Sequence, residues 1–305
     1  MKATSLTAPV LGDALGPRGR RQARIATVVS LAVIAGLVFV AERRLAAKGQ
    51  FKGSLWEPFT QWLPMKFLLV GLLNTLKVAI VAMVLSLTLG GFLALARLAR
   101  SRLARFLAAT YVEFFRSLPL YLLVAFCAFG LPASGVKIGV FTALVLALTL
   151  YNGAVLGEVL RAGIRSLDRG QTEAALAIGL GYWGAMLRVV VPQAMRRMVP
   201  AIVSQLVTLI KDTSLGIVVG YEELLRRGQI SSEFFSNHLA TYVVVAAMYI
   251  TVCYSLSRLA RRLEVRQRRR YNAGPIQVTG LDDLAVVGAL AQAAMPDEGG
   301  AVGLA

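Results

Sequence analysis

The sequence is poor in the residues that most often carry chemistry, with two cysteines and one histidine among 305 residues. Cys127 and Cys253 fall in separate apolar runs without the spacing of a metal site or a redox pair, so we expect small core residues. His238 is expected to be a loop residue rather than a ligand. No lysine follows a glycine, which excludes a P-loop, and neither His-Glu-x-x-His nor Gly-x-Ser-x-Gly occurs. We therefore expect no catalytic residues and no metal site.

Acidic residues are also scarce, with 16 Asp and Glu against 33 Lys and Arg, which gives a net charge of +17. Such basicity can indicate nucleic-acid binding, but its distribution favours another cause. About 21 of the 33 basic residues fall in segments expected on the cytosolic side, about 9 outside and about 3 in apolar runs. This is the positive-inside bias that orients membrane helices, and no nucleic-acid partner is expected. The cytosolic clusters are Arg18 to Arg24, Arg97 to Arg105, Arg161 to Arg169 and Arg258 to Arg270.

Apolar residues, in contrast, make up 57% of the chain, and the mean hydropathy is +0.66. This excess indicates that lipid is the solvent. The chain is long enough for about six spans of roughly 20 residues with their loops. The composition predicts an all-α integral membrane protein, in the cytoplasmic membrane.

The N-terminal apolar run, residues 25–41, has two interpretations. Arginines precede it, as in a signal peptide, but no small-x-small cleavage site follows, because Glu42-Arg43-Arg44 comes directly after. We favour an uncleaved first span, preceded by a disordered cytosolic tail over 1–24. Residues 42–66 are then an external loop, with Trp56 and Trp62 at interface positions.

Five further spans are predicted, and both termini are placed in the cytosol. Gly90-Gly91 near the end of the first of these spans would permit close helix contact. The tail 263–305 is expected to be cytosolic and disordered, since its apolar stretch 284–295 is too short to cross a bilayer. The five spans cover about 67–95, 106–131, 138–160, 187–210 and 239–259.

The most informative polar stretch lies between the fourth and fifth spans, over 165–186. Asp168-x-x-Gln171 is typical of a capping box that starts a short helix. Glu173 would lie in the first turn, where its charge suits the helix dipole. Ala174 and Ala175 favour helix and have little bulk, so that a partner surface could approach the backbone.

This short helix is expected to end at Gly179 or Gly181, which are natural helix stops. Tyr182-Trp183 would supply aromatic anchors, and a second helix would turn into the membrane at Pro192. The pattern predicts a helix–turn–helix bracket on the cytosolic face. These residues alone are equally consistent with an ordinary Ala-rich interfacial helix.

The bracket resembles the EAA loop of ABC-importer permeases, which runs E-A-A, three residues, G, nine residues, I-x-L-P. The chain has Glu173-Ala174-Ala175, Gly179, Val189 and Val191-Pro192 at this spacing, with valine in place of isoleucine and of leucine. Segments from 115 to 225 are more specifically similar to the polar amino-acid permeases, and Tyr221-Glu222-Glu223-Leu224-Leu225 to their glutamate-type members. The similar segments include Phe115-Arg116-Ser117-Leu118-Pro119-Leu120 (Ser and Leu replace Gly and Thr), Glu158-x-x-Arg161-Ala162-Gly163, Pro192-Gln193-Ala194 and Lys211-Asp212-Thr213-Ser214-Leu215.

The resemblance implies a type I importer domain over 67–262, a five-helix core to which the first span is an addition. It also implies a non-catalytic subunit that binds no cofactor, with ATP and Mg²⁺ on a separate ATPase dimer that docks on the bracket. A second permease subunit and an extracytoplasmic amino-acid-binding protein would complete the complex. Transport would be alternating access by rigid-body motion.

Glutamate is the substrate favoured by the resemblance, with glutamine, aspartate or a basic amino acid as alternatives. A secondary carrier would usually show repeated halves or membrane-buried acidic residues, and neither is visible in the sequence. A membrane scaffold without transport activity would leave the spacing from Glu173 to Pro192 unexplained. An anionic substrate needs cations along its path, and ionisable groups within spans indicate function. The candidate path residues are Lys77, Arg196, Arg197 and Lys211.

Overall fold

The structure is a computed structural model that describes residues 16–271. Every regular element in that range is helical, as predicted. The N-terminal part comprises α1 (Pro17–Ala47), α2 (Gly53–Trp56), a 3₁₀ turn (Glu57–Thr60), α3 (Trp62–Leu98), α4 (Arg102–Ser117), α5 (Leu120–Ala125), a π-helical segment (Phe126–Gly130) and α6 (Leu131–Ala133). The remainder comprises α7 (Val140–Arg165), α8 (Arg169–Ala177), α9 (Tyr182–Ala185), a second π-helical segment (Met186–Val190), α10 (Val191–Asp212), the 3₁₀ helix η4 (Thr213–Val219), α11 (Leu224–Phe234) and α12 (His238–Tyr271).

Five helical segments are long and apolar enough to cross a membrane, and a bent pair brings the possible total to six. The five are Gly19–Ala47, Trp62–Leu98, Val140–Arg165, Tyr182–Val219 and His238–Arg266. Several run past the predicted limits: α1 begins inside the tail predicted to be disordered, and α12 continues to Tyr271. The apolar stretch 284–295 lies outside the described residues.

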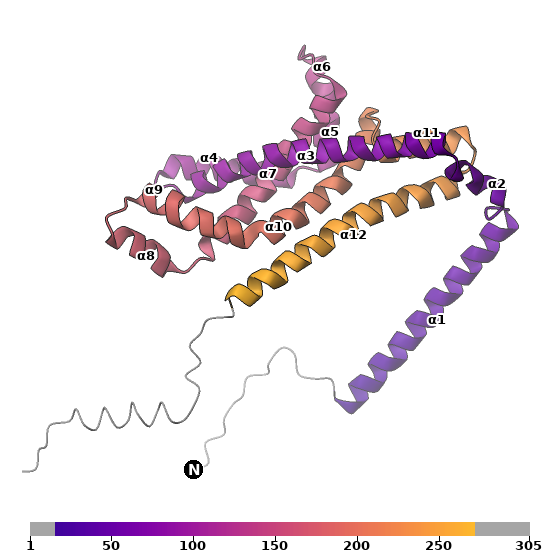
Figure 1. The fold of residues 1–305 in the computed structure, drawn as a ribbon, viewed down its shortest axis with the longest axis horizontal. Coiled ribbons are helices and arrows are strands. Elements are labelled where there is room, and N and C mark those ends of the chain that lie inside the picture. Colours follow the sequence, from indigo (N-terminus) through magenta and orange to yellow (C-terminus); the bar gives the residue numbers. More distant parts are fainter. Residues whose placement is uncertain (1–15, 272–305) are drawn as a thin grey trace, which may run out of the picture.

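The first span stands apart from the others. In Figure 1, α1 diverges from the bundle formed by α3, α4, α7, α10 and α12, and none of its most apolar window is buried. An apolar helix with no protein neighbours is suited to a lipid environment. The segment that follows it, predicted as a loop, is largely helical and is fastened to the bundle, because Asn237 donates to the carbonyl of Leu55 at 2.8 Å.

The span predicted over 106–131 is not one straight helix. α4 and the α5–α6 segment meet at 99° across Ser117–Pro119. Proline lacks the backbone N–H that would continue the helix, and the residue before it is pushed to extended dihedrals. Leu118 adopts ψ 135° accordingly. As a result, α5 and α6 project away from the direction of α4 (Figure 1).

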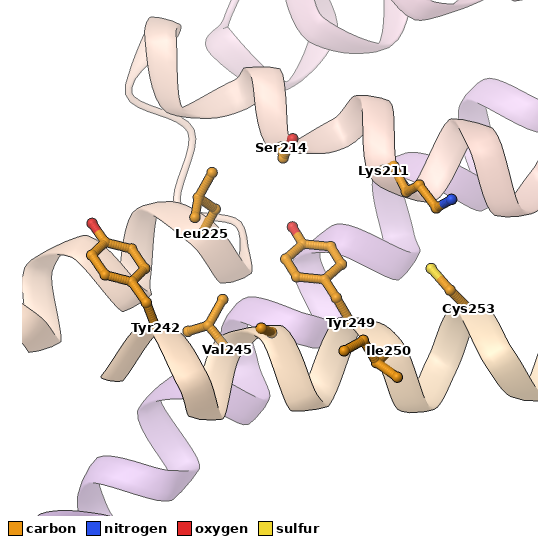
Figure 2. A pocket seen from close by; sticks show the side chains of 9 residues that line it. Lys211, Ser214, Leu225, Tyr242, Val245, Tyr249, Ile250 and Cys253 are labelled. Atoms are coloured by element: carbon orange, nitrogen blue, oxygen red, sulfur yellow. The ribbon is translucent and has the colours of Figure 1, made fainter. Parts of the chain in front are cut away.

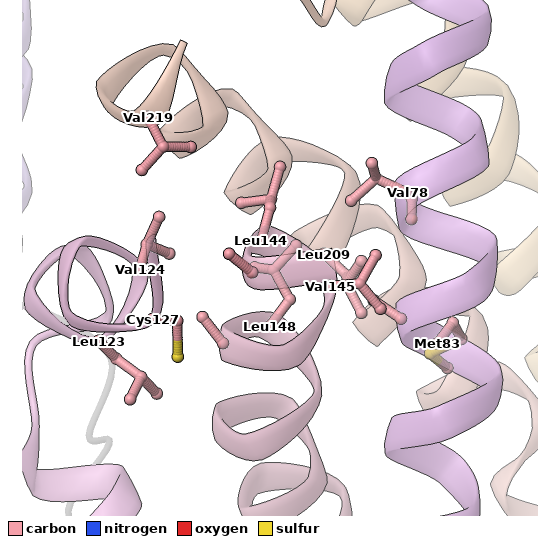
Figure 3. Close-up of a cluster of buried hydrophobic side chains, with 14 of the residues drawn as sticks. Val78, Met83, Leu123, Val124, Cys127, Leu144, Val145, Leu148, Leu209 and Val219 are labelled. Atoms are coloured by element: carbon pink, nitrogen blue, oxygen red, sulfur yellow. The ribbon is translucent and has the colours of Figure 1, made fainter. Parts of the chain in front are cut away.

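The core lies where α3, α5, α7, α10 and η4 meet (Figure 3). Leu144 and Leu148 of α7 are fully buried between Val78 of α3 and Leu209 of α10. Cys127 is buried in this cluster as a small core residue, as the sequence predicts.

α3 and α7 run parallel and make the closest helix contact in the core. A Cβ added to Gly90 would lie 2.9 Å from the carbonyl oxygen of Gly153 and 2.9 Å from the nitrogen of Gly157. The two backbones therefore touch because glycine lies on both sides, as in small-residue packing of membrane helices. The neighbouring Gly91, also predicted as a contact residue, has open space around it.

Glu223 joins α3, α11 and α12 at the bundle end opposite α8. Its fully buried carboxylate accepts from the backbone N–H of Leu225 at 2.9 Å and of Arg226 at 2.7 Å, which caps α11. It also accepts from the hydroxyl of Tyr249 on α12 at 2.7 Å, while Thr75 of α3 accepts from the N–H of Leu224. Burial raises the pKa of the Glu223 carboxyl above its ordinary value.

Candidate functional site

The bracket begins with a capped helix, as the sequence predicts. The Asp168 side chain accepts from the backbone N–H of Gly170 at 2.9 Å and caps α8. Gln171 has a different role from the one a capping box gives it. Its side-chain oxygen accepts from Gln193 at 3.0 Å, so that α8 is tied to the first turn of α10.

α8 ends in a Schellman motif built on Gly179. Gly179 adopts φ +87° and donates to the carbonyl of Leu176, and Leu180 donates to the carbonyl of Ala175. This left-handed conformation disfavours any residue with a Cβ. A Cβ at Gly179 would meet nothing within 4 Å, so the requirement for glycine is one of backbone conformation and not of space.

The exposed surface of α8 carries small and polar residues, with two large apolar residues, Leu176 and Ile178, exposed at its end. Glu173 and Ala174 are exposed. Ala175 is only 3% exposed and packs toward the bundle, so the expectation that both alanines lie open to a partner is wrong for Ala175. Ile178, which the sequence analysis missed, is 78% exposed. Its position directly before the αL glycine was the available signal, because the helix terminus turns that residue outward.

The second arm of the bracket is fixed to the end of α3. The Tyr182 hydroxyl donates to the carbonyl of Leu98 at 2.7 Å, and the Arg100 guanidinium lies 5.0 Å above the Tyr182 ring. Close by, Glu158 of α7 forms ion pairs with Arg97 of α3 and Arg161 of α7. The bracket thus rests on helix ends that are cross-linked to one another.

Pro192 lies within a continuous run of helix and not at a break between two helices. Residues 182–219 form one candidate span that passes through Pro192, with a π-helical segment over Met186–Val190 just before it. The wider π turn removes the need for the N–H that proline lacks. Pro132 follows the other π-helical segment at the same interval of two residues.

Two cavities lie along the groove between α10 and α12, and each holds one of the predicted path cations. Lys211 lines the outer cavity of about 450 Å³ with Ser214, Tyr249 and Cys253 (Figure 2). Arg197 lines the inner cavity of about 530 Å³ at the end nearer the bracket. The two cations are 14 positions apart on one helix, which is about 21 Å of rise and nearly four whole turns, so they share a face.

The other two path candidates lie away from these cavities. Lys77 is exposed on α3, with its ammonium group 5.1 Å above the Phe141 ring of α7. Arg196 is exposed on α10 and is not among the residues that line the two cavities. The structure therefore places Arg197 and Lys211 in separate cavities of one groove, and neither cavity is lined by Lys77 or Arg196.

Comparison with known proteins identifies the family of the chain. Residues 86–269 match the family described as "Binding-protein-dependent transport system inner membrane component". The chain is 44% identical over 204 residues to the probable glutamine ABC transporter permease protein GlnP of Bacillus subtilis (strain 168), which covers 66% of this chain and 94% of that protein. It is 38% identical over 234 residues to the glutamate transport system permease protein GluD of Corynebacterium glutamicum, covering 74% of this chain and 84% of that protein.

The fold is also similar to a solved structure, the crystal structure of an amino acid ABC transporter with histidines. The TM-score is 0.62 at 30% identity, covering 66% of this chain and 94% of that one. The relatives are transport components, so no catalytic role is expected of this subunit. The chain belongs to the inner membrane components of binding-protein-dependent transport systems, as a multi-pass permease of the polar amino-acid ABC importer type.

Proposed function

We propose that the chain translocates glutamate across the cytoplasmic membrane as the permease subunit of an ABC importer. The observation that carries this proposal is the placement of Lys211 and Arg197 on one face of α10, each lining a cavity against α12. A cation beside a cavity within a membrane protein is suited to an anionic group on the substrate.

The proposed assembly follows from the bracket and from the charge distribution. The α8 end carries the arginines of the α3, α7 and α12 termini, so we place it and both chain termini in the cytosol. The exposed face of Glu173, Ala174 and Ile178 would enter a groove on one of two ATPase subunits, which hold the ATP and Mg²⁺. A second permease, identical or related, and an extracytoplasmic binding protein complete the transporter.

Glutamine is the main alternative substrate, because one relative is named for glutamine and another for glutamate. The two amino acids are nearly the same in shape, and their side chains end in a carboxylate in glutamate and a neutral amide in glutamine. A site that uses a lysine to bind the side-chain carboxylate gains a charge-assisted hydrogen bond with glutamate that the neutral amide of glutamine does not match. The α10 cations therefore favour glutamate.

Lys211→Gln is expected to reduce glutamate uptake roughly ten- to hundredfold, the loss that corresponds to a hydrogen bond to a charged group. Glutamine uptake should change much less. The measurement is uptake of both labelled amino acids by the reconstituted complex, with Lys66→Gln at the exposed start of α3 as the control. Equal loss for both substrates, or none for glutamate, would count against an acidic substrate.

Cys253 offers a direct measure of occupancy in the outer cavity. It lines that cavity with Lys211, whereas Cys127 is 2% exposed in the core. Glutamate is expected to slow the reaction of Cys253 with a thiol reagent in the wild-type complex and not in Lys211→Gln. Modification at the same rate with and without glutamate would place the substrate elsewhere.

A further inference from the structure

The inner cavity has more polar chemistry than a passage for one anion requires. On α10 it is lined by Arg197 and Ser204, and on α12 by Ser257, Arg261 and Glu264. The cavity therefore presents two guanidinium groups, one carboxylate and two hydroxyls within about 530 Å³. Apart from Arg197, none of these residues was selected from the sequence, because those on α12 belong to the basic C-terminal run that sets topology.

These groups match the three charges of one class of ligand. A guanidinium binds a carboxylate through two parallel hydrogen bonds, so two arginines suit two carboxylates. Glu264 suits an ammonium group, and the Ser257 hydroxyl can donate to a carboxylate or accept from an ammonium. The three side chains sum to one positive charge, and an amino acid with an acidic side chain carries one negative charge. Binding would leave the cavity neutral.

We propose that the inner cavity is a binding site for a dicarboxylic amino acid, in which Arg197 and Arg261 bind the carboxylates and Glu264 binds the ammonium group. The inference rests on the proposed function, in that glutamate is the ligand of this class that the chain would meet. Arg197 and Glu264 both have partners within the chain. The ligand therefore exchanges some of these contacts for its own, which predicts modest affinity, as release into the cytosol requires.

The position of the site gives it a place in transport. Arg197 lies about 21 Å along α10 from Lys211, too far for one amino acid to contact both cations. It also lies one turn beyond Gln193, the residue of α10 that is bonded to α8 of the bracket. A ligand that contacts both α10 and α12 stabilises the conformation in which the distance between the two helices matches the size of the ligand. The inner cavity is thus a second, separate station, next to the element that moves with the ATPase.

The test uses calorimetric titration of the purified full chain in lipid nanodiscs with glutamate, glutarate and glutamine. Glutarate lacks the ammonium group of glutamate, and glutamine lacks its second negative charge. Wild type is expected to bind glutamate at least tenfold more tightly than either. Arg261→Gln should weaken glutamate binding by tenfold or more. Glu264→Gln should remove the preference for glutamate over glutarate, because the ammonium group then has no carboxylate partner.

Arg258→Gln is the matched control. Arg258 lies less than one turn from Arg261 on α12 and carries the same charge, but its guanidinium lies 5.2 Å above the Tyr254 ring and it does not line the cavity. Its binding curves should equal those of wild type. All titrations are repeated in a Lys211→Gln background, so that heat from the outer cavity does not obscure the result.

Two results would overturn the assignment. One is the absence of saturable glutamate binding, and the other is glutamate binding that is as strong in Arg261→Gln and Glu264→Gln as in the control Arg258→Gln. These outcomes are separable from failure of the proposed function, which is decided by uptake into vesicles that hold the complete complex. If the complex takes up glutamate but the titrations show no glutamate binding, only the inner site is rejected. Arg261-dependent glutamate binding without glutamate uptake would reject the proposed substrate and keep the site.

Discussion

Gly179→Arg is expected to reduce uptake by the assembled transporter to background while the chain still inserts in the membrane. Gly179 closes α8 with φ +87°, a conformation that costs a residue with a Cβ about 1–2 kcal/mol. The Schellman bonds of Gly179 and Leu180 would be lost or strained, and Ile178, 78% exposed, would leave its position on the proposed docking face. The arginine side chain would add bulk and charge where we propose that the ATPase docks.

Three further variants separate the causes of this loss. Gly179→Ala tests the backbone conformation alone and should retain partial uptake. Ile178→Asp and Glu173→Lys leave the backbone intact and change the docking face, and each should uncouple uptake. Gly181→Ala is the control, because Gly181 adopts an ordinary extended conformation with open space around it. Uptake, ATPase stimulation and membrane abundance are measured together, and normal uptake by Gly179→Arg would refute the docking proposal.

Gly90→Leu is expected to prevent accumulation of the folded chain. Its Cβ would lie 2.9 Å from backbone atoms of Gly153 and Gly157, which cannot move aside as a flexible side chain can. Overpacking typically costs about 1–3 kcal/mol, and more where rigid backbone cannot move, which is a large part of the net stability of a folded domain. Yield and monodispersity after detergent extraction provide the measurement.

Gly91→Leu is the matched control for that substitution. Gly91 is the next residue in the same helix, and the substitution is again glycine to leucine. The added Cβ would have no atom within 4 Å. This variant should accumulate as wild type does. Equal behaviour of the two variants would show that the α3–α7 contact does not limit folding.

The sequence predicted those features that depend on local chemistry. Hydropathy located the long apolar helices, and the cap at Asp168 and the stop at Gly179 followed from rules about single turns. The bend at Pro119 was not predicted, although the proline is visible in the sequence. A run of apolar residues indicates that a segment can cross the membrane, but it does not indicate whether the segment is straight. The two π-helical segments, each ending two residues before a proline, show that the chain can also continue as helix past a proline.

Tertiary placement decided the rest of the candidate site. Helix propensity could not say that Ala175 faces inward and Ile178 outward. Arg261 and Glu264 are part of a basic run in the sequence, and only the packing of α12 against α10 makes them line a cavity with Arg197. Lys77 and Lys211 look alike in sequence, yet one lies over an aromatic ring and the other beside a cavity.

The glycine contact between α3 and α7 also limits how this transporter can change shape. Two helices that meet backbone to backbone have no side chains between them to change rotamer, so neither sliding nor tilting is accommodated at small cost. We expect the pair, clamped further by the ion pair of Glu158 with Arg97, to move as one rigid unit. Relative motion is then expected between this unit and α12, with the smallest displacement at the end where the contacts around Glu223 join α12 to α3.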